Sequence, residues 1–96
     1  MQLREHLLEL RDAIYAAAAA SGATDVRVFG SVARSQEEDD SDIDFLITLE
    51  PGRTLLDLAR LEVRLESILG RRVDVVTEGA LREPLRSAAI RDAVRV

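Results

Sequence analysis

Hydrophobic residues in the first part of the chain recur at helical spacing. Leucine or isoleucine occurs every three or four residues, at Leu3, Leu7, Leu10 and Ile14. The alanines at 16–20 continue this pattern, and Gly22 follows them. Because this spacing places apolar side chains on one side of a helix, we expect a helix over residues 2–20. A glycine just past the last turn is a common helix stop.

The pattern then changes to short apolar or alternating segments that are typical of strands. Residues 26–29 are mostly apolar, residues 42–49 alternate between apolar and polar, and residues 73–76 form a third short run. The apolar positions of the alternating segment are Ile43, Phe45, Ile47 and Leu49. Successive side chains of a strand point to opposite faces, so these four are expected to face the core.

A second long helical pattern lies between the last two predicted strands. Pro51 and Gly52 indicate a turn, and Thr54 with Asp57 resembles a capping box that opens a helix. Its core positions are predicted to be Leu55, Leu58, Leu61 and Leu65. Gly70 would end this helix, and a final helix is expected from Pro84 to Asp92.

The order of these elements indicates a small α/β fold. With a short helix expected at 31–36, we predict about three strands flanked by three to four helices. The 96 residues are 47% hydrophobic and 32% charged, which is globular composition and room for one domain, residues 1–96. No apolar run is long enough to cross a membrane, and the charged start does not resemble a secretory signal. We therefore expect a cytoplasmic protein with no membrane association.

Charge and residue usage exclude several kinds of site. Thirteen basic and eighteen acidic residues give a net charge of −5, which argues against direct binding of nucleic acid through its phosphates. All the basic residues are arginine, so chemistry that depends on a lysine is excluded. The absence of cysteine excludes disulfides, thiolate metal sites and cysteine nucleophiles.

Three aspartates on predicted strands are the first candidates for chemistry. Asp42 and Asp44 are two residues apart on one strand, so both side chains leave the same face. Taken alone, this pair also fits an ordinary solvated surface. Asp74 adds a third carboxylate within a strand that is expected to be buried, where an uncompensated charge is costly. If the two strands are neighbours, the carboxylates converge on one spot, and Mg²⁺ is the natural counter-charge.

A glycine and a serine precede this acidic pair. Gly30 and Ser31 end the first predicted strand and open the short helix. A glycine allows close approach of backbone to a ligand, and a helix N-terminus favours phosphate. A Gly-Ser pair alone is more often a plain turn. Beside a set of metal-binding carboxylates, however, it indicates phosphoryl or nucleotidyl transfer.

These motifs together resemble a known superfamily. The string from Phe29 to Arg34, followed after a spacer by Asp42-Ile43-Asp44, resembles the Gly-Ser and Asp-x-Asp signature of polymerase-beta-like nucleotidyltransferases. The small size and the segments 51–58 and 70–77 are similar to the minimal nucleotidyltransferases, or MNT proteins. The resemblance covers about residues 24–90, and it implies a palm-like nucleotidyltransferase fold on a small mixed sheet.

The resemblance also implies roles for individual residues. Asp42 and Asp44 would ligate two Mg²⁺ ions, and Asp74 would ligate the catalytic metal and help to deprotonate the attacking hydroxyl. Gly30 and Ser31 would hold the triphosphate of the ATP substrate. Diphosphate would leave after an in-line displacement at the α-phosphate.

Arg34 is the one basic residue inside the motif, and its role stays open between two interpretations. It would either approach the γ-phosphate of the nucleotide or pair with the acidic segment 37–40. The family often has glycine at the position of Ser35, which is a minor departure from the pattern.

MNT proteins are known as antitoxins paired with HEPN toxins, and this resemblance implies a partner. The leading interpretation is a Mg-dependent enzyme that transfers AMP from ATP to a tyrosine of a cognate HEPN ribonuclease toxin, in a hetero-oligomeric complex. One alternative is a binding-only antitoxin with the same fold. The other is a nucleotidyltransferase acting on a small-molecule hydroxyl, which usually needs an added acceptor-binding domain.

Overall fold

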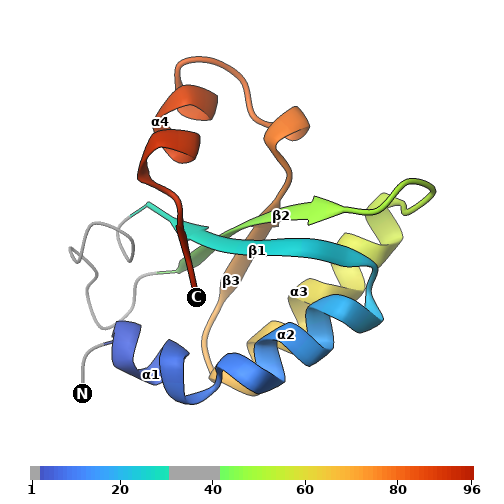
Figure 1. Cartoon of the computed structure of the whole chain (residues 1–96), viewed down its shortest axis with the longest axis vertical. Helices are drawn as coiled ribbons and strands as arrows, with labels where there is room; N and C mark the ends of the chain where they lie inside the picture. Colours follow the sequence, from blue (N-terminus) through green and yellow to red (C-terminus); the bar gives the residue numbers. More distant parts are fainter. Residues whose placement is uncertain (1–2, 31–41) are drawn as a thin grey trace.

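A four-stranded mixed β-sheet forms the centre of the molecule (Figure 1). The computed structural model describes residues 3–30 and 42–96. Its strands are β1 (Ala23–Phe29), β2 (Ile43–Leu49), β3 (Val73–Val76) and β4 (Val94–Arg95). They lie in the order β3-β2-β1-β4, with β2 and β3 parallel and the other two pairings antiparallel. The sheet confirms the three predicted strands and adds β4.

Helices cover both faces of this sheet. The α-helices are α1 (Leu3–Glu9), α2 (Arg11–Ala20), α3 (Leu55–Leu69) and α4 (Leu85–Asp92), and a short 3-10 helix, η1, spans Glu78–Ala80. In Figure 1, α1, α2 and α3 lie below the sheet, whereas η1 and α4 lie above it. The expected helix at 31–36 falls outside the described residues.

The first predicted helix is present but bends at Leu10. Leu10 has φ −96° and ψ 8°, which interrupts regular helix between α1 and α2. Its N–H still donates to His6 O at 3.1 Å, and its carbonyl accepts from Ile14 N at 3.0 Å. The prediction of one continuous helix over 2–20 is therefore wrong at this position. With the bend in place, both Leu7 and Ile14 are buried in the core.

The core lies between the sheet and the helices α2 and α3. The alternating positions Ile43, Phe45 and Ile47 of β2 are all buried, as their pattern predicts. They pack in one cluster with the inner leucines of α3, which are Leu58, Leu61, Leu65 and Leu69. Leu55 is an exception to the prediction, because it lies in the first turn on the outer side of α3 and is 80% exposed.

Local signals set both ends of α3. The N–H of Thr54 donates to the Asp57 carboxylate at 2.9 Å, which is the expected capping box. Gly70 takes a left-handed φ of 69° and donates its N–H to Glu66 O at 2.8 Å. The helix therefore begins and ends where the sequence predicts, and it connects β2 to the parallel strand β3.

No helix in the described residues is long and apolar enough to cross a membrane.

Candidate active site

Strand pairing places two of the predicted site aspartates side by side. Asp44 of β2 is in register with Asp74 of the parallel strand β3, and on its other side Asp44 is in register with Phe29 of β1. Directly opposite residues on neighbouring strands project to the same face of a sheet. The structure therefore brings Asp44 and Asp74 together on the face that α4 covers, as expected if their strands are neighbours.

Asp74 is exposed, which differs from the expectation of a buried strand. The reason is its position in the sheet, because β3 is the outermost strand next to β2 and only its first residue, Val73, is buried. The apolar sequence of β3 indicates its core-facing side. It does not indicate that the other side of an edge strand meets solvent. Asp74 therefore needs no buried counter-charge to be tolerated in the fold.

Asp42 lies just before β2 rather than on it, so the predicted strand 42–49 begins one residue too early. Its Oδ1 atom forms an ion pair with Arg72 Nε at 3.3 Å. The backbone carbonyl of Arg72 also accepts a hydrogen bond from Ile43 N at 3.1 Å, which ties the starts of β2 and β3 together. The Asp42 carboxylate thus lies two residues before Asp44 in the chain but is directed to an arginine.

The carboxylates are not gathered into a closed metal-binding set. Among residues 3–30 and 42–96, no group of three histidine, cysteine or acidic side chains is arranged closely enough to hold a metal ion. Even so, the donor chemistry of Asp44 and Asp74 fits Mg²⁺, which binds one or two carboxylates and completes its shell with water and phosphate oxygens. Asp42 would have to leave Arg72 to join them, and an exposed ion pair of this kind is held weakly.

Gly30 lies directly against the Asp44 carboxylate. Its φ of +72° is left-handed, a conformation that side chains rarely adopt, and a Cβ at this position would collide with Asp44 Oδ2. The left-handed backbone therefore favours glycine, and a side chain here would also displace the Asp44 carboxylate. Ser31 and Arg34, the other two predicted phosphate contacts, lie outside the described residues.

A cleft of about 250 Å³ opens beside this pair. One wall comes from the sheet, with Phe29, Gly30 and Asp44. The other wall comes from α4 and the segment before it, and its lining residues are Leu81, Leu85, Ala88, Ala89 and Asp92. One side of the cleft therefore offers the Asp44 carboxylate and the backbone of Gly30, and the other side is mainly apolar. This combination suits a ligand with a charged end and a flat apolar end.

The α4 wall is the part of the site that sequence reasoning missed. The spacing of Leu85, Ala88 and Ala89 predicts a helix, but it carries no signal that this helix borders the acidic motif. Asp92 adds a second carboxylate to the cleft and forms an ion pair with Arg91, with Nε and Oδ1 3.3 Å apart. Two carboxylates lining one small cleft favour a cation within it.

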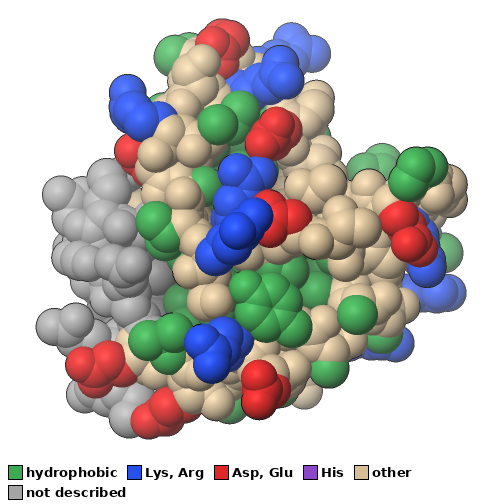
Figure 2. Space-filling view, in the orientation of Figure 1, with side chains coloured by type: hydrophobic (Ala, Val, Ile, Leu, Met, Phe, Trp, Pro, Cys, Tyr) green, Lys and Arg blue, Asp and Glu red, His purple; other side chains and the backbone are tan. Residues whose placement is uncertain are grey.

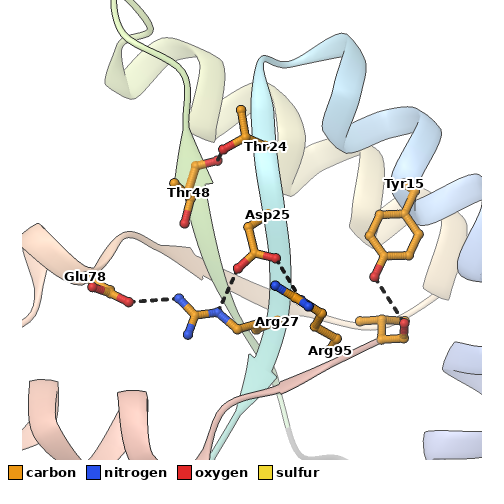
Figure 3. Close-up of polar contacts among 8 residues, drawn as sticks. Tyr15, Thr24, Asp25, Arg27, Thr48, Glu78 and Arg95 are labelled. Atoms are coloured by element: carbon orange, nitrogen blue, oxygen red, sulfur yellow. Dashed lines mark hydrogen bonds and ion pairs between the residues drawn. The ribbon is translucent and has the colours of Figure 1, made fainter.

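An ion-pair cluster on the same sheet face holds the segment that leads to α4 (Figure 3). Arg27 of β1 contacts Asp25 Oδ2 through Nε at 3.0 Å, and its Nη2 donates to Glu78 Oε1 of η1 at 2.8 Å. Arg95 of β4 donates from Nε to Asp25 Oδ1 at 3.3 Å. Figure 2 shows basic and acidic side chains adjacent at the centre of this view, over β1 and β4. The cluster links β1, β4 and η1. It thereby holds η1, which precedes the α4 wall of the cleft, against the sheet.

Solved structures with this arrangement of helices and strands include a protein assigned to the minimal nucleotidyltransferases. That protein is 49% identical in sequence, superposes with a TM-score of 0.87, and is covered over 97% of its length by 100% of this chain. A toxin–antitoxin complex with AMP-PNP contains a chain that superposes with a TM-score of 0.74. At 19% identity, over 88% of this chain and 69% of that one, this second likeness shows the shared fold alone.

Sequence relatives agree with the structural ones. Protein adenylyltransferase MntA from Thermococcus cleftensis is 35% identical over 94 residues, which are 98% of this chain and 88% of that protein. A Methanocaldococcus jannaschii protein with the provisional name protein adenylyltransferase is 42% identical over 69 residues, 72% of this chain and 74% of that protein. Residues 4–96 match the nucleotidyltransferase domain family. With its Gly-Ser and Asp-x-Asp motifs on a matching fold, this chain belongs to the nucleotidyltransferase domain family.

Proposed function

We propose that this chain is a Mg-dependent protein adenylyltransferase that acts as an antitoxin. It would transfer AMP from ATP to a tyrosine hydroxyl of a cognate HEPN ribonuclease toxin in the cytoplasm and thereby neutralise the toxin. The observation that carries the proposal is the register of Asp44 with Asp74 beside the Gly30 turn and the cleft. A relative named protein adenylyltransferase, of which this chain covers 88%, supports the same chemistry.

Asp44 and Asp74 would hold Mg²⁺, and Asp42 would join them when it leaves Arg72. When bound, a pair of such ions stabilises the charge on the entering and leaving oxygens of an in-line displacement. Gly30 allows the nucleotide phosphates to lie against the backbone next to Asp44, and Ser31 would contribute a hydroxyl. The apolar α4 wall, with Leu85 and Ala88, would contact the nucleoside.

In the proposed reaction, the tyrosine oxygen forms a bond to the α-phosphorus of ATP. The bond from that phosphorus to the bridging oxygen breaks, and diphosphate leaves with the electron pair. Asp74 would accept the proton of the tyrosine hydroxyl. Its exposed position on an edge strand suits this role, because an acceptor carried by another protein can reach it without entering a closed pocket.

Intact-mass measurement of both proteins tests this function. The chain is incubated with ATP and Mg²⁺, with and without the purified toxin, and the matched variant Asp44→Asn is treated in the same way. We expect the toxin to gain AMP only with the wild-type chain, and Tyr→Phe replacement of the modified residue to abolish the gain. A stable complex with no mass change would instead support the binding-only antitoxin. Transfer to a small-molecule hydroxyl but not to the toxin would support the other alternative.

The variant that combines Asp42→Ala with Asp44→Ala separates the metal assignment from the fold. Asp42 precedes β2 and Asp44 lies near its start, and both are only half-buried, so their loss should leave the protein folded while it abolishes transfer. Continued AMP transfer by this double variant in the presence of Mg²⁺ would show that the metal assignment is wrong.

A further inference from the structure

The outward side of α3 carries aliphatic residues that the core does not use. Leu56, Ala59 and Val63 are spaced three and four residues apart, so they form one line along the helix, which we name the α3 stripe. All three are exposed, with Leu56 at 58% and Val63 at 66%. Leu55 beside them is 80% exposed. The buried leucines of α3 lie on its opposite side, so the stripe adds nothing to the packing of this domain.

The surface of the stripe is hollowed at its middle, where a side chain of another protein could bind. Ala59 is the smallest side chain along it, and a shallow hollow there is lined by Ala59, Arg60, Val63 and Arg64. Small residues on a helix surface allow a second element to approach closely, while the larger neighbours supply the walls. An aliphatic side chain of a partner could rest against Ala59 and Val63 at this point.

Two arginines border the stripe without partners in the described structure. Arg60 and Arg64 are one helical turn apart and exposed. Within residues 3–30 and 42–96, neither makes an ion pair or a hydrogen bond. This is informative in a chain of net charge −5, where acidic side chains outnumber the basic ones. The charge beside the stripe is therefore complementary to a partner that presents carboxylates next to aliphatic residues.

The same charges argue against a second copy of this chain as the occupant. Two copies would each bring a net charge of −5. A two-fold antiparallel pairing of α3 with itself would also place the arginine-lined edges of the two helices against each other, which is repulsive. A different protein with an acidic amphipathic helix avoids both costs.

We propose that the α3 stripe, together with Arg60 and Arg64, is the docking surface for the toxin partner. The identity of that partner rests on the proposed function, whereas its chemistry, an amphipathic helix with aliphatic residues beside aspartate or glutamate, rests on the surface itself. In Figure 1, α3 and α4 lie on opposite sides of the sheet, and the cleft lies on the side of α4. A toxin held on α3 would leave the cleft open to nucleotide, and AMP transfer to its tyrosine would require a separate encounter at the cleft, so binding and AMP transfer are separable.

The test uses two double variants of the α3 stripe and its arginines, and one double variant elsewhere as the control. Variant one combines Leu56→Ser with Val63→Ser, and variant two combines Arg60→Glu with Arg64→Glu. The control variant combines Leu8→Ser on α1, where Leu8 is 54% exposed, with Arg11→Glu at the exposed start of α2. Circular dichroism checks that each protein is folded. Titration calorimetry with the purified toxin gives Kd, and intact mass at saturating toxin gives AMP transfer.

We expect each α3 variant to weaken toxin binding at least about tenfold, since central interface residues commonly contribute this much, while the control stays within about twofold. Unchanged Kd in both α3 variants would overturn the docking surface. A wild-type homodimer that these substitutions dissociate, with toxin binding intact, would assign the surface to a second copy and also overturn the proposal. Toxin binding that is lost in the α3 variants, with no AMP transfer by the wild type, would confirm the docking surface and refute the proposed enzyme activity.

Discussion

Gly30 and the Asp44 carboxylate are so close that a side chain at position 30 would displace the carboxylate. The glycine turns with φ +72° at the end of β1, and a Cβ there would collide with Asp44 Oδ2. The register of β1 with β2, which pairs Phe29 with Asp44, produces this approach. The backbone that would meet phosphate and the carboxylate that would meet metal are therefore one structural unit.

This contact predicts the effect of Gly30→Ala. The left-handed backbone alone should cost about 1–2 kcal/mol in the free energy of unfolding. The displaced Asp44 carboxylate should lower AMP transfer at least about tenfold, because small errors in position are costly for oriented reactants. Chemical denaturation and the intact-mass assay measure the two effects.

Gly52→Ala is the matched control. Gly52 also has a positive φ, of 90°, but a Cβ there would meet nothing within 4 Å. This variant should lose a similar free energy of unfolding and keep its activity. Equal loss of activity in both variants would mean that backbone strain, rather than the Asp44 contact, is responsible.

The neighbouring carboxylates of Asp44 and Asp74 predict a stability that depends on Mg²⁺. Without the ion, Asp74→Asn should leave stability unchanged or raise it by up to about 0.5 kcal/mol, since like charges directly opposite on a sheet are destabilising. With Mg²⁺ at ten times its Kd, the wild type should gain about 1.4 kcal/mol, and the variant should gain much less. Thermal unfolding in a Mg²⁺ titration measures both. Equal stabilisation of the two proteins would remove Asp74 from the metal site.

Two arginines that contact the same aspartate should differ in their effect on stability. Arg27 is 20% exposed and joins Asp25 to Glu78, whereas Arg95 is 77% exposed and forms an ion pair only with Asp25 among the residues described. Arg27→Met should cost about 1–2 kcal/mol, because it breaks partly buried charged hydrogen bonds. Arg95→Met should cost less than about 0.5 kcal/mol, as exposed ion pairs do. Urea unfolding measures both, and equal costs would show that the link to η1 is unimportant.

The cap of α3 predicts a dependence of stability on pH. The Thr54 N–H that donates to Asp57 lowers the pKa of this carboxyl, and the charge of Arg53 acts in the same direction. A lowered folded pKa means that the contribution of the carboxylate is complete above the unfolded value of about 3.9 and is lost as the pH falls through the folded value.

The measurement is the melting temperature of the wild type and of Asp57→Ala between pH 2 and pH 7. We expect the wild type to melt higher near neutral pH, and the difference to shrink below about pH 4. A difference that is the same at pH 2 and pH 7 would show that the charged carboxylate does not stabilise the helix. Glu83, whose pKa is lowered by its contacts with Ser87, is present in both proteins and cancels in the comparison.

The elements that the sequence predicts correctly are those defined by near neighbours. The capping of α3 by Thr54 and Asp57 and its end at Gly70 involve residues three or four positions apart. The alternation of apolar and polar residues along β2 likewise predicts which side of the strand is buried. The motif chemistry belongs to this class too, because Gly30 and the Asp-x-Asp pair are recognisable without knowing where they lie in space.

Other features depended on contacts between distant segments. The two residues of β4 become a strand only because they pair with Arg27 and Val28. Contacts between distant segments also decide which way α4 faces, and they bring Asp42 to Arg72. The exposure of Asp74 follows from the edge position of β3 in the assembled sheet. Period, capping and motif are local, so the residues alone were enough to predict the family, most of the elements and the candidate chemistry of this protein. The tertiary structure alone decided which groups share the cleft and which surface of α3 remains exposed, because burial depends on how distant segments pack against one another.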